Sequence, residues 1–428
     1  MLLVLLVLVG VVGLLAVVHW YVWRRLVRDV TVPGGAARRL GTIALVVLPL
    51  LSLAALTAGR AGVPFWLQRV VSWPGFLWLA LLLYLVLALV VGEAVRPLLR
   101  RALDRRAAST PAAPPAPAAP PVTVPPAPAP AAPAPEPPTA PEPPASAGPT
   151  AATGPSRRLF VSRVVGGAAA AAALGTVGYG TYGVLRGPRV KRVTVPLAKL
   201  PRGVHGYRIA VVSDIHLGPI LGRAHTQRIV DAINATQPDL VAVVGDMVDG
   251  SVENLGPAAE PLAGLRARDG SFFVTGNHEY FSGAEQWVDH VRELGMRPLR
   301  NERVEIAGFD LAGVNDVAGE NYGDGPDFAA ALGDRDRARA AVLLAHQPVV
   351  IHDAVEHGVD LQLSGHTHGG QLWPGNYLAE LANPTVAGLE RYGDTQLYVS
   401  RGAGAWGPPV RVGAPSDITL VELASKRA

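Results

Sequence analysis

The sequence contains no cysteine, which excludes disulfide bonds, thiolate metal sites, iron–sulfur clusters and a cysteine nucleophile. Charged residues are also scarce: they make up 17% of the 428 residues, whereas an ordinary soluble domain carries about 25%. Hydrophobic residues account for 49%. A chain that is poor in charge and rich in apolar residues is typical of proteins with membrane-spanning segments. Its length predicts roughly two or three structural units.

The charges that are present divide unevenly along the chain. Residues 1–185 contain 15 Lys and Arg against 5 Asp and Glu, whereas residues 186–428 contain 23 against 29. The excess of basic charge therefore belongs to the N-terminal part, which is also the apolar part. A nucleic-acid-binding domain needs a basic patch on its own surface, so no nucleic-acid binding is expected.

Three apolar stretches within residues 1–106 have the length of membrane-spanning helices, at about residues 2–23, 41–58 and 76–92. A cleaved signal peptide is the alternative for the first, but no basic segment precedes it and no small-residue cleavage site follows it. Buried core helices are the alternative for all three. Three such stretches in succession favour a membrane anchor, and none has an ionisable residue in its middle that would mark a transport pathway.

The next segment, residues 107–156, is rich in proline and alanine. It contains 19 of the 39 prolines, all between residues 111 and 155, so we expect a disordered, extended linker. Residues 157–189 contain a fourth predicted span, rich in alanine and glycine. The sequence S-R-R-L-F-V (156–161) at its start resembles a twin-arginine export signature. An ordinary basic flank at a membrane boundary is the alternative.

The arginines between the spans predict their orientation, because positively charged connections tend to stay in the cytoplasm. The first connection has five arginines and the third has eight, whereas the second has only Arg60 and Arg69. We therefore expect a multi-pass protein of the cell membrane whose C-terminal domain is extracytoplasmic. Four basic residues argue for the opposite orientation, since they directly follow the fourth span: Arg186, Arg189, Lys191 and Arg192.

Residues 190–428 show the pattern of an α/β domain. Short apolar runs alternate with stretches of helical periodicity, as expected for buried strands connected by helices. Five of these runs are followed directly by polar residues, and they lie at 208–213, 240–244, 271–274, 341–345 and 361–363. Because ligands bind beyond the carboxyl ends of the strands in open α/β sheets, we expect these polar residues to lie together.

The polar residues after the strands are potential metal ligands: Asp214, His216, Asp246, Asn277, His346, His366 and His368. Oxygen and imidazole ligands without sulfur suit Mn, Fe or Zn ions. On an extended backbone alternate residues point to the same side, so Asp214 with His216, and His366 with His368, would each present two donors together. Seven ligands are too many for one tetrahedral ion and match two ions that share a bridging carboxylate.

These residues carry a resemblance to the calcineurin-like metallophosphoesterase superfamily. The matching motifs are D-I-H (214–216), G-D-x-x-D (245–249), G-N-H-E (276–279), H-Q-P (346–348) and G-H-T-H (365–368). The longer run G-H-T-H-G-G-Q-L-W-P (365–374) is similar to a membrane-associated bacterial subgroup. The resemblance covers about residues 207–423 and implies a sandwich of two mixed β-sheets flanked by helices.

The resemblance also implies a role for each residue. The two ions would be held by Asp214, His216 and His368, and by Asn277, His346 and His366, with Asp246 as the bridge. His278 would face the phosphate and assist the leaving oxygen, and Asp249 would orient a ligand imidazole. Arg401, which follows a strand near the C-terminus, is a candidate phosphate contact.

These observations predict a membrane-anchored, metal-dependent phosphoesterase that hydrolyses a phosphate ester or pyrophosphate bond with a dinuclear metal-bound hydroxide. The alternative is a non-catalytic membrane sensor or scaffold whose domain binds metal and a phosphorylated ligand. His278 favours the enzyme, because a binding site needs no acid for a leaving group. The expected partners are the membrane and a phosphorylated substrate, for example one derived from a lipid or from the cell envelope.

Overall fold

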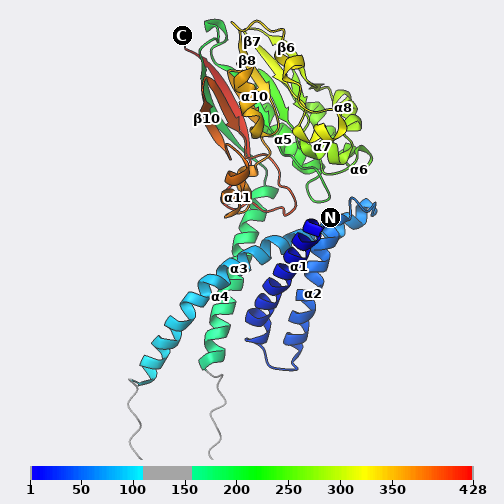
Figure 1. Ribbon diagram of the computed structural model, residues 1–428. Coiled ribbons are helices and arrows are strands. Elements are labelled where there is room, and N and C mark those ends of the chain that lie inside the picture. The colour runs from blue at the N-terminus through cyan, green and yellow to red at the C-terminus, as the bar shows by residue number, and fades with distance from the viewer. Residues whose placement is uncertain (1, 109–156, 427–428) are drawn as a thin grey trace, which may run out of the picture.

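A computed structural model describes residues 2–108 and 157–426 of the chain. Within these residues, four helices are long and apolar enough to cross a membrane, judged by length and composition. They are α1 (Leu2–Trp23), α2 (Ala36–Thr57), α3 (Phe65–Ala108) and α4 (Arg157–Leu185), and a π-helical turn, η1 (Arg24–Arg28), continues α1. All four lie on one side of the C-terminal domain (Figure 1).

The helices differ from the expected spans in their bounds. The third span is expected at 76–92, whereas α3 runs from Phe65 to Ala108 and includes Pro74 and Pro97. Its charged residues end the apolar run without ending the helix, because arginine is a good helix former. The helix α2 begins at Ala36 rather than at residue 41. The predicted linker lies outside the described residues, except for its first two residues, which belong to α3.

The C-terminal domain is a sandwich of two six-stranded mixed sheets, which confirms the predicted fold class. The first sheet has the order β1-β12-β2-β3-β4-β5, and the second has the order β10-β11-β9-β8-β7-β6. Strands β2 to β5 are parallel to one another, as are β7, β8, β9 and β11. The strands of the first sheet are β1 (Arg189–Leu197), β2 (Tyr207–Val212), β3 (Leu240–Val244), β4 (Ser271–Val274), β5 (Arg297–Pro298) and β12 (Asp417–Ser425). Those of the second are β6 (Glu302–Ile306), β7 (Phe309–Gly313), β8 (Ala340–Leu344), β9 (Leu361–Ser364), β10 (Gly388–Tyr392) and β11 (Thr395–Val399).

Apolar side chains fill three layers of this sandwich. The central layer lies between the sheets and includes Val211, Leu311 and Val342. The outer layers pack helices on each sheet: α5 (Arg223–Ala235), α6 (Val252–Ala259) and α8 (Ala284–Glu293) on the first, and α9 (Phe328–Leu332) and α10 (Ile351–Glu356) on the second. Because strands such as β3 are buried on both faces, they read in sequence as continuous apolar runs.

Shorter elements connect these layers. Two helices, α7 (Asn277–Ser282) and α11 (Gly375–Ala382), lie in connections between strands. The described 3-10 turns are η2 (Arg202–Val204), η3 (Glu260–Gly264), η4 (Val317–Tyr322), η5 (Pro348–Val350) and η6 (His368–Gly370).

The domain contacts the helices through the loop that precedes β12. Val410 of this loop is buried in the same apolar cluster as Trp78 of α3 and Ala173 of α4. The amide of Arg411 donates to the carbonyl of Gly180 at 3.3 Å. A Cβ at Gly180 would lie 2.7 Å from Val410 Cγ1, so a glycine is needed for this close approach. The last turns of α4 are thereby packed against the domain.

Candidate metal centre

The seven predicted ligands lie together where strands of both sheets end. Asp214 and His216 follow β2, Asp246 follows β3, and Asn277 begins α7 directly after β4. From the second sheet, His346 follows β8, and His366 and His368 follow β9. The parallel strands place these ends at one edge of each sheet, and the packing of the two sheets brings the edges together.

The first group of potential ligands consists of Asp214, His216 and His368. The Nε2 atoms of the two histidines lie 3.0 Å apart, and Nε2 of His368 lies 3.3 Å from Oδ1 of Asp214. All three side chains are buried. Their donor atoms all lie within 4.8 Å of one another, so one metal ion can contact all three.

The second group consists of Asp246, His346 and His366. Oδ2 of Asp246 lies 3.1 Å from Nε2 of His346, and Asn277 Oδ1 lies 3.1 Å from Nδ1 of His366. The same Oδ2 lies 3.8 Å from Nε2 of His216, a member of the first group. Asp246 is therefore placed between the two groups, where a bridging ligand would lie.

The backbone at these residues is left-handed. The φ angle is 52° at Asp214, 48° at His216, 52° at Asp246, 71° at His366 and 53° at His368. The extended backbone expected at Asp214 with His216, and at His366 with His368, is therefore wrong. Residues other than glycine rarely adopt this backbone conformation, and such strained residues cluster at functional sites, where the surrounding structure holds them.

The donor set fits metal ions. His346 Nδ1 lies 2.9 Å from the carbonyl of Val244, so this nitrogen donates and Nε2 faces Asp246. Among the described residues, Nε2 of His346 has no hydrogen-bond partner although it is buried. His216 is held in the same way, with Nδ1 2.9 Å from Oδ1 of Asp249. Imidazoles fixed through one ring nitrogen, combined with carboxylates, suit Mn, Fe or Zn ions.

The carboxylates of the centre have unequal proton affinities. Burial raises the pKa of Asp214 above its usual value. Burial acts in the same direction on Asp246, but the adjacent His346 outweighs it and holds the pKa of Asp246 well below its usual range. The carboxylate between the two groups is thus the one that keeps its negative charge more firmly.

The pKa values of the histidines are also shifted in opposite directions. Burial lowers the pKa of His366 to about 4 and that of His368 well below its usual value, so both rings are neutral at neutral pH. Burial also acts to lower the pKa of His216, but the Asp249 carboxylate outweighs it and raises the pKa to about 9. A metal ion that binds His216 therefore has to displace a proton.

Glu279 supports the centre, although the sequence motif assigned it no role. Its buried carboxylate accepts hydrogen bonds from the amides of Asp246 at 2.9 Å, Met247 at 2.8 Å and Gly276 at 2.6 Å. Burial raises the pKa of Glu279 to about 7. A Cβ at Gly276 would collide with Oδ1 of Asp246, so this glycine is required for the contact. Together they fix the backbone of Asp246, the residue between the two groups of potential ligands.

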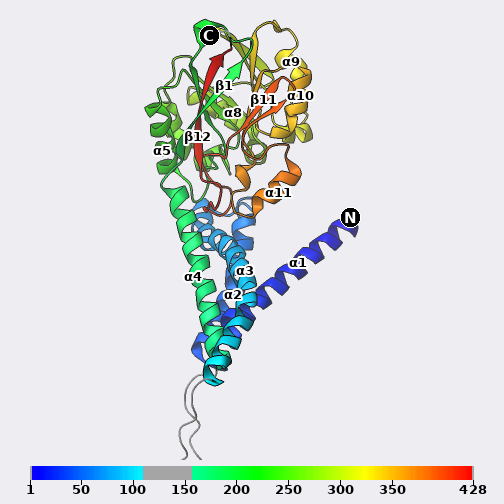
Figure 2. The same ribbon diagram turned by 90° about the vertical axis from the view of Figure 1, so that its left-hand side faces the viewer.

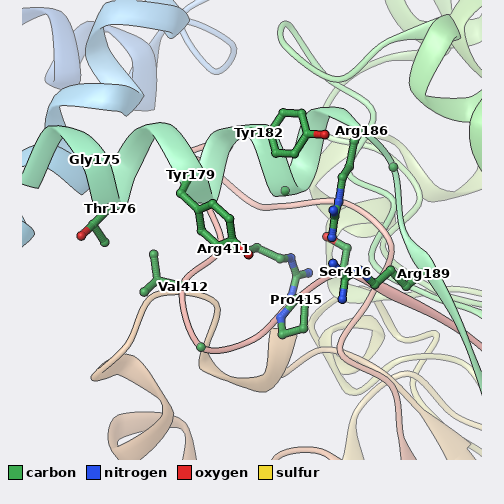
Figure 3. Close-up of a pocket in the computed structure, with 13 residues that line it drawn as sticks. Gly175, Thr176, Tyr179, Tyr182, Arg186, Arg189, Arg411, Val412, Pro415 and Ser416 are labelled. Carbon is green, nitrogen blue, oxygen red and sulfur yellow. The ribbon is translucent and has the colours of Figure 1, made fainter.

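Arg411 is a second supporting residue that no motif indicated. It is buried, its guanidinium donates to the carbonyl of His368 at 2.9 Å, and its Nη2 lies 3.0 Å from His368 Nδ1. Figure 3 shows it beside Tyr179 of α4 and Pro415. It lies 43 residues from His368 in the sequence, so only the fold brings the two together.

Two of the other predicted site residues, Asp249 and His278, lie at the centre, whereas the third, Arg401, does not. Asp249 contacts two imidazoles, because its Oδ1 lies 2.7 Å from Nδ1 of His278 as well as close to His216. Nε2 of His278 lies 3.9 Å from Oδ2 of Asp246, so its assignment as an acid rather than a ligand stays a prediction. Arg401 does not line the cleft above the ligands, and its side chain lies beside Gly369.

A cleft of about 1230 Å³ opens above the ligands, and His216, Asp246, Asn277, His278, His366 and His368 line it. Buried ligands at the floor of an open cleft give a substrate access to the centre without exposing the ligands themselves.

Comparisons with known proteins identify the domain. The model of the calcineurin-like phosphoesterase family matches residues 207–370. A protein of Helicobacter pylori described as an uncharacterized metallophosphoesterase is 39% identical over 258 residues, which cover 60% of this chain and 69% of that protein. The chain belongs to the calcineurin-like phosphoesterase family.

Two further relatives resemble this phosphoesterase over a similar length. An uncharacterized metallophosphoesterase of Aquifex aeolicus is 37% identical over 243 residues, covering 56% of this chain and 92% of that protein. A zebrafish (Danio rerio) protein named "Transmembrane protein with metallophosphoesterase domain" is 39% identical over 259 residues, covering 57% of this chain and 59% of the zebrafish protein. The chain thus spans less than two thirds of the zebrafish relative. The four apolar helices and that relative's name associate the chain with a membrane.

Proposed function

We propose that the chain is a membrane-anchored phosphoesterase whose centre holds two metal ions and hydrolyses a phosphate ester or pyrophosphate bond. The observation that carries this proposal is the position of Asp246, whose Oδ2 lies 3.1 Å from His346 and 3.8 Å from His216. One carboxylate oxygen between two groups of imidazoles is the arrangement that two adjacent ions require.

The ions would be held by Asp214, His216 and His368, by Asn277, His346 and His366, and by Asp246 between them. When bound, two such ions polarise phosphoryl oxygens and activate water at neutral pH. The chain's own residues align these ligands: Asp249 and Val244 fix imidazoles, and Glu279 fixes the backbone of Asp246. His278, at the edge of the cleft, supplies the proton to the leaving oxygen.

The test uses the purified full-length protein, stripped of metal with a chelator and reloaded with Mn²⁺. We expect two ions per chain by elemental analysis and release of phosphate or alcohol from simple esters. Asp246→Asn should lose both ions and the activity, because it removes the charge shared by the two groups. Asp289→Asn, an exposed carboxylate on α8, is the matched control and should lose neither.

The same experiment separates the enzyme from the sensor or scaffold alternative. A protein that binds two ions and inorganic phosphate, but hydrolyses no ester, would contradict the enzyme and support the sensor. A single ion at saturation would contradict the dinuclear centre.

We further propose that the four helices cross the cell membrane and that the domain is extracytoplasmic. The arginine-rich connection after α1, the end of α3 and the beginning of α4 lie at the end of the helices away from the domain, whereas the segment between α2 and α3 lies at the domain end (Figure 1). Because positively charged connections tend to stay in the cytoplasm, the end of the helices away from the domain would be cytoplasmic. A C-terminal reporter enzyme that is active only after export should be active, and activity from a cytoplasm-restricted reporter alone would reverse the orientation.

A further inference from the structure

The cleft above the metal centre has a second wall that does not come from the phosphoesterase domain. The end of α2 and the beginning of α3 form this wall, and its apolar side chains are Leu53, Leu56, Phe65, Phe76 and Leu79. Phe65 also packs against the apolar cluster that covers the first sheet. The cleft is therefore one continuous space, with metal ligands at one side and membrane helices at the other.

The domain side of the cleft contains an apolar surface next to His278. The rings of Phe281 and Trp406 lie 5.6 Å and 5.9 Å from the His278 ring, centroid to centroid. These two side chains are 57% and 54% exposed, and Ile220 and Leu221 continue the surface. A water-soluble phosphate ester gains little from such a wall, whereas a hydrocarbon chain is removed from water there.

The surface next to the helices has the character of a membrane interface. In α11 no residue is buried, and Leu378 and Leu381 are 71% and 85% exposed. This helix lies at the end of the domain that faces the membrane helices (Figure 2). The hydroxyl of Tyr84 in α3 donates to the carbonyl of Trp373, just before α11, at 2.9 Å. Large exposed apolar side chains on a short amphipathic helix are typical of a helix that rests in the headgroup region.

One cation lines the helix side of the cleft. Arg60 lies in the connection between α2 and α3 and borders the same space as the ligands. Arg69, on the first turns of α3, does not border it. A guanidinium at the membrane end of the cleft suits the anionic headgroup of a lipid, because it pairs with phosphate through two parallel hydrogen bonds.

We propose that the substrate is a membrane lipid with a phosphorylated headgroup, which enters from the bilayer along α2 and α3. Its phosphoryl group lies at the metal centre, and its hydrocarbon chain lies against Leu53, Leu56 and Leu79. Water adds to phosphorus, the bond between phosphorus and the leaving oxygen breaks, and that oxygen takes a proton. The inference rests on the proposed phosphoesterase activity and adds the class of substrate.

The test compares the full-length, Mn²⁺-loaded protein on two ester series in detergent, monoalkyl phosphates and p-nitrophenyl alkyl phosphates. Within each series the reacting bond is constant and only the alkyl chain lengthens. We expect kcat/KM to rise by about tenfold or more from the shortest to the longest chain, because each fully buried methylene favours binding by roughly fourfold.

Variants of the cleft residues test where the hydrocarbon chain of the substrate lies. Leu56→Trp fills the helix side of the cleft and should lower the ratio of long-chain to short-chain kcat/KM by about tenfold, and Leu53→Trp is a second variant of the same design. Val47→Trp is the matched control: it lies nine residues before Leu56, which places it on the opposite face of α2 at about 3.6 residues per turn. Val47 does not border the cleft, so its variant should keep the ratio. Metal content, two ions per chain, shows that each variant is folded.

The headgroup contact has its own test. Arg60→Gln should raise KM for a lipid pyrophosphate in mixed micelles by about tenfold, because its second phosphate is left for Arg60 when the terminal one lies at the metal centre, and Arg69→Gln should not.

The outcomes separate the two proposals. Hydrolysis that is independent of the length of the alkyl chain, or that responds equally to Leu56→Trp and Val47→Trp, would overturn the proposal of a lipid substrate. The proposal of a phosphoesterase would stand. A protein that binds two ions and hydrolyses no member of either series would overturn the phosphoesterase, and the lipid substrate with it.

Discussion

Nδ1 of His278 lies 2.7 Å from Oδ1 of Asp249, and the same oxygen lies 2.9 Å from Nδ1 of His216. A carboxylate oxygen only accepts hydrogen bonds, so both imidazoles donate through Nδ1 and direct Nε2 toward the centre. One side chain therefore aligns His216, a proposed metal ligand, and the histidine that faces the cleft. The two rings meet edge to face, with centroids 4.7 Å apart.

Asp249→Asn should weaken this alignment without removing a ligand. The amide is a neutral, poorer acceptor, and it cannot stabilise the positive charge that His216 shares with a bound ion. We expect metal affinity or activity to fall by about 10–100-fold, as is usual for residues that orient metal ligands. Metal titration and steady-state kinetics measure the change, with Asp289→Asn as the control. Affinity and kcat both equal to those of the parent protein would contradict the role.

The sequence predicted the strands of the site well because of how they are buried. The runs at 240–244 and 271–274 coincide with β3 and β4, and the other three lie within one residue of β2, β8 and β9. A strand buried on both faces has few polar residues, so it stands out between polar loops. Strands such as β6, with exposed positions and arginine or glutamate in them, give no such signal.

The sequence could not predict how the ligands are oriented. Because alternate residues of an extended backbone point to the same side, the sequence suggested an extended backbone at Asp214 and His216. The backbone is left-handed at both residues. Local propensity disfavours that conformation for aspartate and histidine, and hydrogen bonds to other segments hold it: the amides of Asp214 and His216 donate to the carbonyls of Gly245 and Asp246. Arg411 could not be found either, because its partner His368 is near it only in the folded chain.

Arg411 is predicted to be a positioning residue for one of the two metal sites. Arg411→Gln removes the charged donor to the carbonyl of His368, which fixes the backbone of this residue, so the ion held by His368 should bind about 10–100-fold more weakly. The ion held by His346 and His366 should be affected less. Arg411→Lys should restore part of the affinity, since it keeps one charged donor.

Stepwise metal titration, read by elemental analysis, separates this role from a general loss of stability. Arg401→Gln is the control, because Arg401 lies nearby without contacting a ligand imidazole. Equal weakening of both ions by Arg411→Gln would show that the residue stabilises the fold rather than one site.

His278→Ala tests the one residue whose position allows two roles. Its Nε2 lies 3.9 Å from Asp246, close enough for a ligand, yet its side chain is partly exposed at the cleft, unlike the fully buried His216. If it donates a proton to the leaving oxygen, the variant keeps two ions and a KM within a few-fold of the parent. Its kcat falls by roughly 10²–10⁴-fold on an alkyl phosphate, which is the usual contribution of a general acid.

The leaving group decides between the roles. Nitrophenolate departs without a proton, so on p-nitrophenyl phosphate the same variant should lose much less activity than on the alkyl ester. A ligand, in contrast, would be needed equally for both esters, because it acts through the ion and not on the leaving oxygen. Loss of an ion from His278→Ala, or an equal loss of kcat on both esters, would therefore make His278 part of the metal site and leave the leaving oxygen to be protonated by water.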